Sequence, residues 1–158
     1  MGDPVLLALD AGVRQTGWAC FQSKRLLRTG VIASPKRNGL KGKYRIASLI
    51  SELDPLAENS HPKTVACCQL SGINWTVPSI RLLEESLLAW AESRRIGCFN
   101  YTTQEIRAAV AGFANASPDR LGFAIMVRLG LIGQRRSTHE WEAVAVGYYH
   151  LSRSTQQG

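Results

Sequence analysis

Four side chains that can bind a divalent metal ion stand at the ends of predicted elements. Asp10 closes the apolar, strand-length run VLLALD, and Gln69 closes a second run, TVACCQ. His139 and Glu142 are three residues apart in a predicted C-terminal helix, so they share one of its faces. If the two strands are parallel neighbours, their carboxyl ends meet at one edge of the sheet, where α/β proteins bind ligands. The sequence therefore predicts a metal site there.

The chemistry of such a site is phosphodiester hydrolysis. Two Mg²⁺ or Mn²⁺ ions, about 4 Å apart, activate a water molecule and stabilise the leaving oxygen. Gln69 contributes only a neutral carbonyl oxygen, so Asp10, Glu142 and a neutral His139 leave the site with about two negative charges. That is a weak counter-charge for two divalent ions.

Basic residues are concentrated in the first third of the chain. Residues 1–50 hold nine Lys or Arg against two Asp and carry the entire net charge of +7. No acid falls between residues 24 and 45. This charge density favours a polyanionic partner such as nucleic acid. The alternative is a solvated face that only keeps the protein soluble.

Length and composition exclude several classes of protein. With 158 residues, 45% of them hydrophobic, the chain fits one α/β domain over residues 1–151 and a frayed tail over 152–158. No apolar run reaches the roughly 18 residues of a membrane span, and the N-terminus is unlike a signal peptide. The four cysteines lack C-x-x-C spacing, which argues against zinc and disulfides. We expect a cytoplasmic protein without membrane contact.

The predicted elements form a mixed sheet of five strands with helices on both faces. The first three strands are joined by short turns and are therefore antiparallel, whereas the fourth follows a helix and should run parallel to the first. The strands are expected at residues 5–10, 18–21, 26–32, 64–69 and 98–101. The helices are expected around residues 46–56, 80–95, 103–110, 118–129 and 138–150, with Thr102 or Thr103, Ser117 and Thr138 as N-caps.

Three segments resemble the RuvC family of Holliday-junction resolvases, which have the ribonuclease H-like fold. Residues 7–21, LALDAGVRQTGWACF, resemble the first strand and turn of that family. Residues 101–131 resemble its fifth strand and next two helices, and residues 138–150, THEWEAVAVGYYH, its last catalytic helix. The resemblance spans roughly residues 5–150. It implies a homodimer that binds four-way DNA junctions, nicks two strands symmetrically with Mg²⁺, and works with a branch-migration helicase.

The resemblance implies a role for each predicted metal ligand. Asp10 matches the family's metal-bridging aspartate, Glu142 its final acid, and His139 a position filled by aspartate or histidine. The chain departs from the family at Gln69, where the family has glutamate. Two hypotheses follow: a resolvase-like endonuclease with lowered metal affinity, or a branched-DNA-binding protein that does not cut. A relative of the same fold that acts on structured RNA is a third.

Further residues are predicted to contact DNA. Arg14 follows Asp10 in the turn, and Arg107 falls where the family has a basic residue near the scissile phosphate, although Pro118 replaces another family lysine. Trp75 is the one aromatic residue in the loop from which the family inserts a side chain into the junction; packing on the next helix is its alternative role. The complete predicted DNA-binding set is Arg14, Lys36, Arg37, Lys41, Lys43, Trp75 and Arg107.

A second resemblance is set aside on length. The segment DAGVRQTG, which begins at Asp10, also looks like the phosphate loop of actin-like ATPases and sugar kinases. Those proteins enclose ATP between two such domains, and 158 residues supply only one.

Overall fold

The computed structural model describes residues 2–33, 42–69 and 78–156, without the side chains of residue 69 and residues 154–156. Four of the predicted DNA-binding residues, Lys36, Arg37, Lys41 and Trp75, lie outside the described residues. Among the described helices, none is both long and apolar enough to cross a membrane.

The described chain contains one five-stranded sheet with the order β3-β2-β1-β4-β5. β2 is antiparallel to both of its neighbours, β1 and β3, and β4 and β5 run parallel to β1, as predicted. The strands are β1 (Val5–Asp10), β2 (Gln15–Gln22), β3 (Arg25–Ala33), β4 (Pro62–Gln69) and β5 (Gly97–Thr102). The mixed α/β class expected from the sequence is therefore confirmed.

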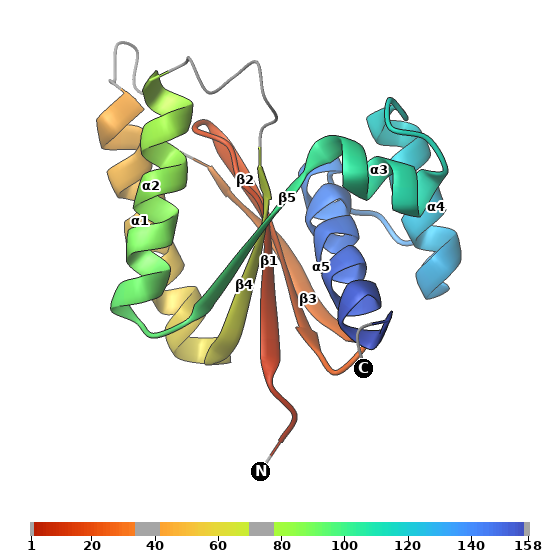
Figure 1. Ribbon diagram of the computed structural model, residues 1–158, viewed down its shortest axis with the longest axis horizontal. Helices are drawn as coiled ribbons and strands as arrows, with labels where there is room; N and C mark the ends of the chain where they lie inside the picture. The colour runs from red at the N-terminus through yellow and green to blue at the C-terminus, as the bar shows by residue number, and fades with distance from the viewer. Residues whose placement is uncertain (1, 34–41, 70–77, 157–158) are drawn as a thin grey trace.

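Helices cover both faces of the sheet (Figure 1), with α1 and α2 on one side and α3, α4 and α5 on the other. The helices are α1 (Gly42–Ser60), α2 (Pro78–Ser93), α3 (Thr103–Ala111), α4 (Pro118–Leu129) and α5 (Thr138–Gln156). The carboxyl ends of β1 and β4 lie at the same end of the molecule as the start of α5 (Figure 1). This arrangement brings the predicted metal ligands to one edge of the sheet.

The two cores follow from the alternation of side chains along β1. Leu7 and Leu9 are buried against α1 and α2, whereas Leu6 and Ala8 are buried against α3, α4 and α5. Because successive strand residues point to opposite faces, Asp10 continues the set of Leu6 and Ala8. Its carboxylate is therefore directed toward α5.

Several boundaries differ from the sequence prediction. β2 begins at Gln15, three residues earlier than expected, because Gln15, Thr16 and Gly17 pair with β3 although glycine is depleted in strands. α5 continues to Gln156, into the segment 152–158 that was expected to be a frayed tail. The predicted caps of α3 and α4 are confirmed, with Thr102 and Ser117 accepting backbone N–H bonds.

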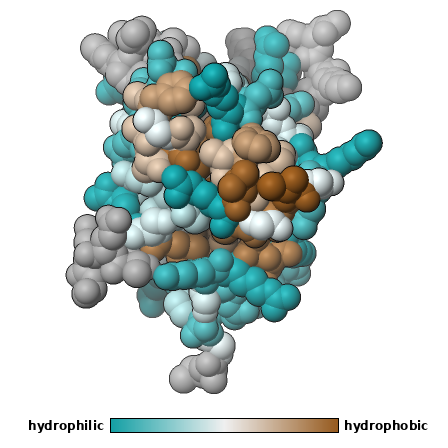
Figure 2. Space-filling model, turned by 90° about the vertical axis from the view of Figure 1, so that its right-hand side faces the viewer, coloured by the Kyte–Doolittle hydropathy of each residue, from teal (hydrophilic) through white to brown (hydrophobic). Residues whose placement is uncertain are grey.

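The outer face of α4 also carries apolar side chains. Phe123 is 61% exposed and Val127 50% exposed, one turn apart, while Leu121 and Ile125 are turned to the core. Figure 2 shows apolar atoms gathered on this side of the molecule. Within the described chain, α4 thus buries only one of its two apolar faces.

Candidate metal centre and nucleic-acid interface

Asp10 and Cys68 occupy neighbouring positions on the two central parallel strands. Leu9 pairs with Cys67, so Asp10 lies beside position 68. Ala8 and its partner Ala66 both face α5, and the next positions on that face are Asp10 and Cys68. Cys68 Sγ lies 3.2 Å from Thr103 Oγ1, which fixes the thiol inside this corner of the sheet.

The turn after Asp10 is held by Thr16, whose side chain is buried. Its hydroxyl donates to the Gly12 carbonyl at 3.1 Å and accepts from the Gly12 N–H at 3.2 Å. Gly17 follows, and a Cβ there would lie only 2.0 Å from the His139 carbonyl oxygen. A glycine at this position therefore lets the first turn of α5 approach the sheet.

A capping box sets the start of α5. The Glu140 N–H donates to Ser137 Oγ at 3.2 Å, and the Ser137 N–H donates to Glu140 Oε2 at 2.7 Å. The cap is thus Ser137, one residue before the predicted Thr138. Thr29 on β3 also donates to Glu140 Oε1 at 3.1 Å, which ties the helix start to the sheet.

Three of the predicted ligands converge. Asp10, His139 and Glu142 offer ligand atoms that all lie within 4.8 Å of one another. His139 Nδ1 lies 3.0 Å from Asp10 Oδ2, and Arg107 Nη2 donates to Glu142 Oε1 at 3.1 Å. A small cavity of about 160 Å³ opens beside them, lined in part by Cys68 and Arg107.

Burial dominates the electrostatics of Glu142. Desolvation by burial raises the pKa of Glu142 to about 7, and a hydrogen bond with Asp10 and the negative charge of Asp10 act in the same direction. Arg107 opposes the shift. A carboxyl group held near neutrality in this way can exchange a proton for a cation at ordinary pH. The site is therefore prepared for a positive charge beyond that of Arg107.

Comparisons with known proteins show what the chain resembles in sequence and in fold. A scan against protein-family models finds no match. A curated relative, the crossover junction endodeoxyribonuclease RuvC of Chloroflexus aggregans, is 24% identical over 151 residues, covering 91% of this chain and 90% of the relative. The structure of Thermus thermophilus RuvC matches 97% of this chain with a TM-score of 0.80 and 18% identity, and covers 96% of its own chain. The chain is RuvC-like in sequence and fold.

A second solved structure is the complex of T. thermophilus RuvC with a Holliday junction substrate. It matches 98% of the RuvC-like chain and 96% of its own chain, with a TM-score of 0.79 and 18% identity. The ribonuclease H-like fold expected from the three sequence segments is therefore confirmed over nearly the whole chain.

Cys68 is the site residue that the sequence interpretation missed. The strand position on the face of Asp10 is 68, and position 69 is the next one along β4, paired with Thr102 of β5. The side chain of Gln69 lies outside the described residues, so its role as a ligand stays a prediction. The alternation along β4 indicates Cys68 only once the pairing of Ala8 with Ala66 is known.

The Cys68 thiol is not a substitute for a carboxylate. Burial, together with the charges of Asp10 and Glu142, raises the pKa of Cys68 to about 11, although the hydrogen bond with Thr103 opposes the shift. In the metal-free protein the thiol is therefore protonated at neutral pH, and sulfur is in any case a poor ligand for a hard ion such as Mg²⁺.

The described members of the predicted DNA-binding set lie at different distances from this centre. Arg107 is part of it, and its side chain is 20% exposed. Arg14 is exposed in the turn that follows Asp10. Lys43 is exposed in the first turn of α1, with its Nζ 5.1 Å from the centroid of the Tyr44 ring. Arg107 thus contacts the metal-ligand cluster directly, whereas Arg14 is placed near it only by its position four residues after Asp10.

Proposed function

We propose that the RuvC-like chain is a Holliday-junction resolvase-like endonuclease that acts on four-way DNA in the cytoplasm. The convergence of Asp10, His139 and Glu142 at the end of the parallel strands carries this proposal. Arg107, which pairs with Glu142, and Arg14, in the turn after Asp10, would supply positive charge for the phosphates of the substrate.

The donor set fits one divalent ion. Two carboxylates and an imidazole within 4.8 Å of one another are ligands for Mg²⁺ or Mn²⁺. Asp10, His139 and Glu142 would hold it, and such an ion, when bound, activates water and stabilises the leaving oxygen. A second ion would need another negative ligand. Neither candidate on β4 supplies one, because Cys68 offers a neutral thiol and Gln69 only an amide oxygen.

The chain's own residues prepare this centre. Arg107 balances the charge of Glu142 and presents a guanidinium toward the cavity, where a phosphate oxygen could replace the carboxylate as its partner. His139 and Asp10 orient each other through their 3.0 Å contact. Gly17 and the capping box of Ser137 fix the helix turn that carries both α5 ligands.

The alternative is a branched-DNA-binding protein that does not cut. A specific observation favours it: Arg107 already pairs with Glu142, and the thiol of Cys68 stands beside Asp10. Both features lower the negative charge available to metal ions. We therefore expect tight junction binding with weak or absent cleavage.

The test uses synthetic four-way junctions with Mg²⁺ or Mn²⁺, and linear duplex and structured RNA of matched length as competitors. Cleavage that Asp10→Asn abolishes supports the endonuclease. Binding of the junction without cleavage supports the alternative. Equal affinity for junction and duplex contradicts both, and a preference for the RNA assigns the chain to an RNA-processing function.

We also propose that the chain acts as a homodimer, with a branch-migration helicase as a further partner by family resemblance. A groove of about 620 Å³ between α1 and α2 is lined by Ile46, Ile50, Leu82 and Trp90. Leu82 is 39% exposed. A second copy would remove this apolar surface from water.

A further inference from the structure

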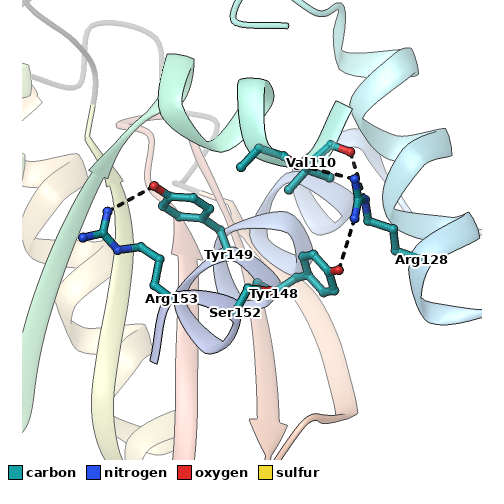
Figure 3. Close-up of a pocket in the computed structure, with 7 residues that line it drawn as sticks. Val110, Arg128, Tyr148, Tyr149, Ser152 and Arg153 are labelled. Atoms are coloured by element: carbon teal, nitrogen blue, oxygen red, sulfur yellow. Dashed lines mark hydrogen bonds between the residues drawn. The ribbon is translucent and has the colours of Figure 1, made fainter. Parts of the chain in front are cut away.

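A second groove lies between α3, α4 and the C-terminal half of α5 (Figure 3). It has a volume of about 500 Å³, and its polar lining comes chiefly from Arg128, Tyr148, Tyr149 and Arg153. Tyr149 follows Glu142 by seven residues, which corresponds to about 10 Å along the helix axis. The groove shares no lining residue with the cavity beside Asp10.

Arg128 is fixed at one end of this groove. Its Nε donates to the Val110 carbonyl at 3.0 Å, near the end of α3, and its Nη1 donates to the Tyr148 hydroxyl at 3.4 Å. The guanidinium also lies over the Tyr148 ring, 5.8 Å from its centroid. Figure 3 shows the arginine and this tyrosine directed toward each other.

Arg153 and Tyr149 form a corresponding pair at the other end. Arg153 Nη1 donates to the Tyr149 hydroxyl at 3.1 Å, and the guanidinium lies 5.7 Å from the centroid of that ring. The side chain of Arg153 is 45% exposed, so it keeps donors within reach of a ligand. The Tyr149 ring itself is held by an edge-to-face contact with Tyr101 at 5.0 Å.

The hydrogen bonds of this groove leave donors available to a ligand, although Arg128 Nη2 also donates to the Ala109 carbonyl at 3.5 Å. In each Arg–Tyr pair the phenol oxygen accepts from the guanidinium, so its own O–H remains able to donate. Among the described residues that line the groove there is no acid. Just outside this lining, Arg153 Nη1 forms an ion pair with Glu105 at 3.9 Å, and Thr102 Oγ1 donates to that carboxylate at 3.2 Å. The groove therefore suits an anion.

We propose that this groove binds the phosphate ester of a nucleotide. Two guanidinium groups and two phenol hydroxyls match the acceptors of a phosphate, and tyrosine rings offer surfaces for a base. A volume of about 500 Å³ exceeds the need of inorganic phosphate and falls within the range of pockets for small organic ligands. The nucleotide is either free in solution or part of a DNA strand that leaves the Asp10 centre.

Calorimetric titration with deoxyadenosine 5′-monophosphate tests the proposal, with inorganic phosphate and the uncharged nucleoside as comparison ligands. We expect the monophosphate to bind more tightly than either. Arg153→Glu should weaken its binding about tenfold or more, because a charge-assisted hydrogen bond is lost and a repulsive charge is introduced. Tyr149→Phe, which keeps the ring and removes only the hydroxyl, should weaken it less.

Arg95→Glu is the matched control, because it makes the same charge change at an exposed arginine of the α2–β5 turn. Equal losses in Arg153→Glu and Arg95→Glu, no binding of the monophosphate, or wild-type affinity in Arg153→Glu would overturn the proposal. Tyr149→Phe guards against misfolding of the charge variants, since it alters one hydroxyl.

A short single-stranded oligonucleotide distinguishes the two sources of the ligand. If the groove receives a DNA strand, Arg153→Glu weakens the binding of the oligonucleotide and of the mononucleotide alike. If it receives a free nucleotide, only mononucleotide binding falls. Asp10→Asn should leave the binding of nucleotides to this groove unchanged in both cases. The nucleotide proposal and the resolvase proposal can therefore fail independently of each other.

Discussion

Arg107 and Glu142 form an ion pair at 3.1 Å, and their side chains are only 20% and 19% exposed. The carboxylate that would bind a metal ion is thus already partnered by a fixed positive charge. The Nε of Arg107 is buried and has no hydrogen-bond partner within the described residues. An unpaired buried donor costs free energy. A hydrogen bond from this Nε to a phosphate oxygen would therefore stabilise the complex more than a hydrogen bond at the surface would.

The raised pKa of Glu142 predicts an unusual dependence of stability on pH. The folded state holds the proton up to a pKa of about 7, whereas the unfolded chain releases it near the ordinary value of 4.5. The free energy of unfolding of the metal-free protein should therefore fall as the pH rises from 4.5 to 7, by at most about 1.4 kcal/mol per pH unit from this group. Urea unfolding with a chelator present measures it.

Glu142→Gln should flatten this slope, because the amide imitates the protonated carboxyl and still accepts from Arg107. Glu85→Gln, at an exposed acid of α2, should leave the slope unchanged. Mn²⁺ should restore stability to the unaltered protein at pH 8, since the ion binds the deprotonated form. An identical slope in the protein and in Glu142→Gln would show that Glu142 titrates normally.

Two substitutions at adjacent positions of β4 test which residue, Cys68 or Gln69, stands where the RuvC family has its glutamate. Cys68→Glu places a carboxylate on the face of Asp10, so we expect at least a tenfold gain in Mn²⁺ affinity or a second bound ion, together with a gain in junction cleavage. Gln69→Glu adds the same charge one residue away and should change both quantities little. Calorimetry gives the affinity and the number of ions. The opposite ranking would assign the family's glutamate position to Gln69.

The sequence was sufficient for the architecture because local signals agreed with one another. VLLALD and TVACCQ are apolar runs bounded by turns, and Thr102 with Glu105 and Ser117 with Pro118 mark helix starts by their capping chemistry. The N-cap of α5 was placed one residue too late, since Ser137 and Thr138 are both suitable caps. The capping box with Glu140 decides between them.

The candidate site was predicted less completely than the fold. Residue spacing brought Asp10, His139 and Glu142 together correctly, but the fourth position was chosen by residue type, and a polar Gln69 was preferred to an apolar-looking Cys68. Only the parallel register, in which Leu9 pairs with Cys67, shows which position shares the face of Asp10. The Arg107–Glu142 pair joins two helices far apart in sequence and had no local signal.

The proposed dimer predicts a concentration-dependent mass. Leu82→Glu puts a charge into the apolar groove between α1 and α2, and desolvating it at an interface costs several kcal/mol. We expect a monomer at concentrations where the unaltered chain is dimeric, as measured by analytical ultracentrifugation. Leu27→Glu is the control, since Leu27 is 45% exposed on β3 and lines no part of this groove. A dimer that survives Leu82→Glu would place the interface elsewhere.

Two glycines of similar appearance should respond in opposite directions to alanine. Gly17→Ala would set its Cβ 2.0 Å from the His139 carbonyl oxygen, a backbone atom that can move only if the start of α5 moves. We expect a loss of about 1–3 kcal/mol in the free energy of unfolding, and weaker Mn²⁺ binding, because His139 and Glu142 shift away from Asp10.

Gly122→Ala provides the matched comparison. Its Cβ would meet the Trp141 side chain at an ordinary 3.7 Å, and the position lies inside α4. Alanine should therefore stabilise the protein by about 0.5–1 kcal/mol and leave metal binding unchanged. Urea unfolding and Mn²⁺ titration of both variants measure these effects. If Gly17→Ala bound Mn²⁺ as tightly as Gly122→Ala, the close approach of β2 and α5 would not be what positions the ligands.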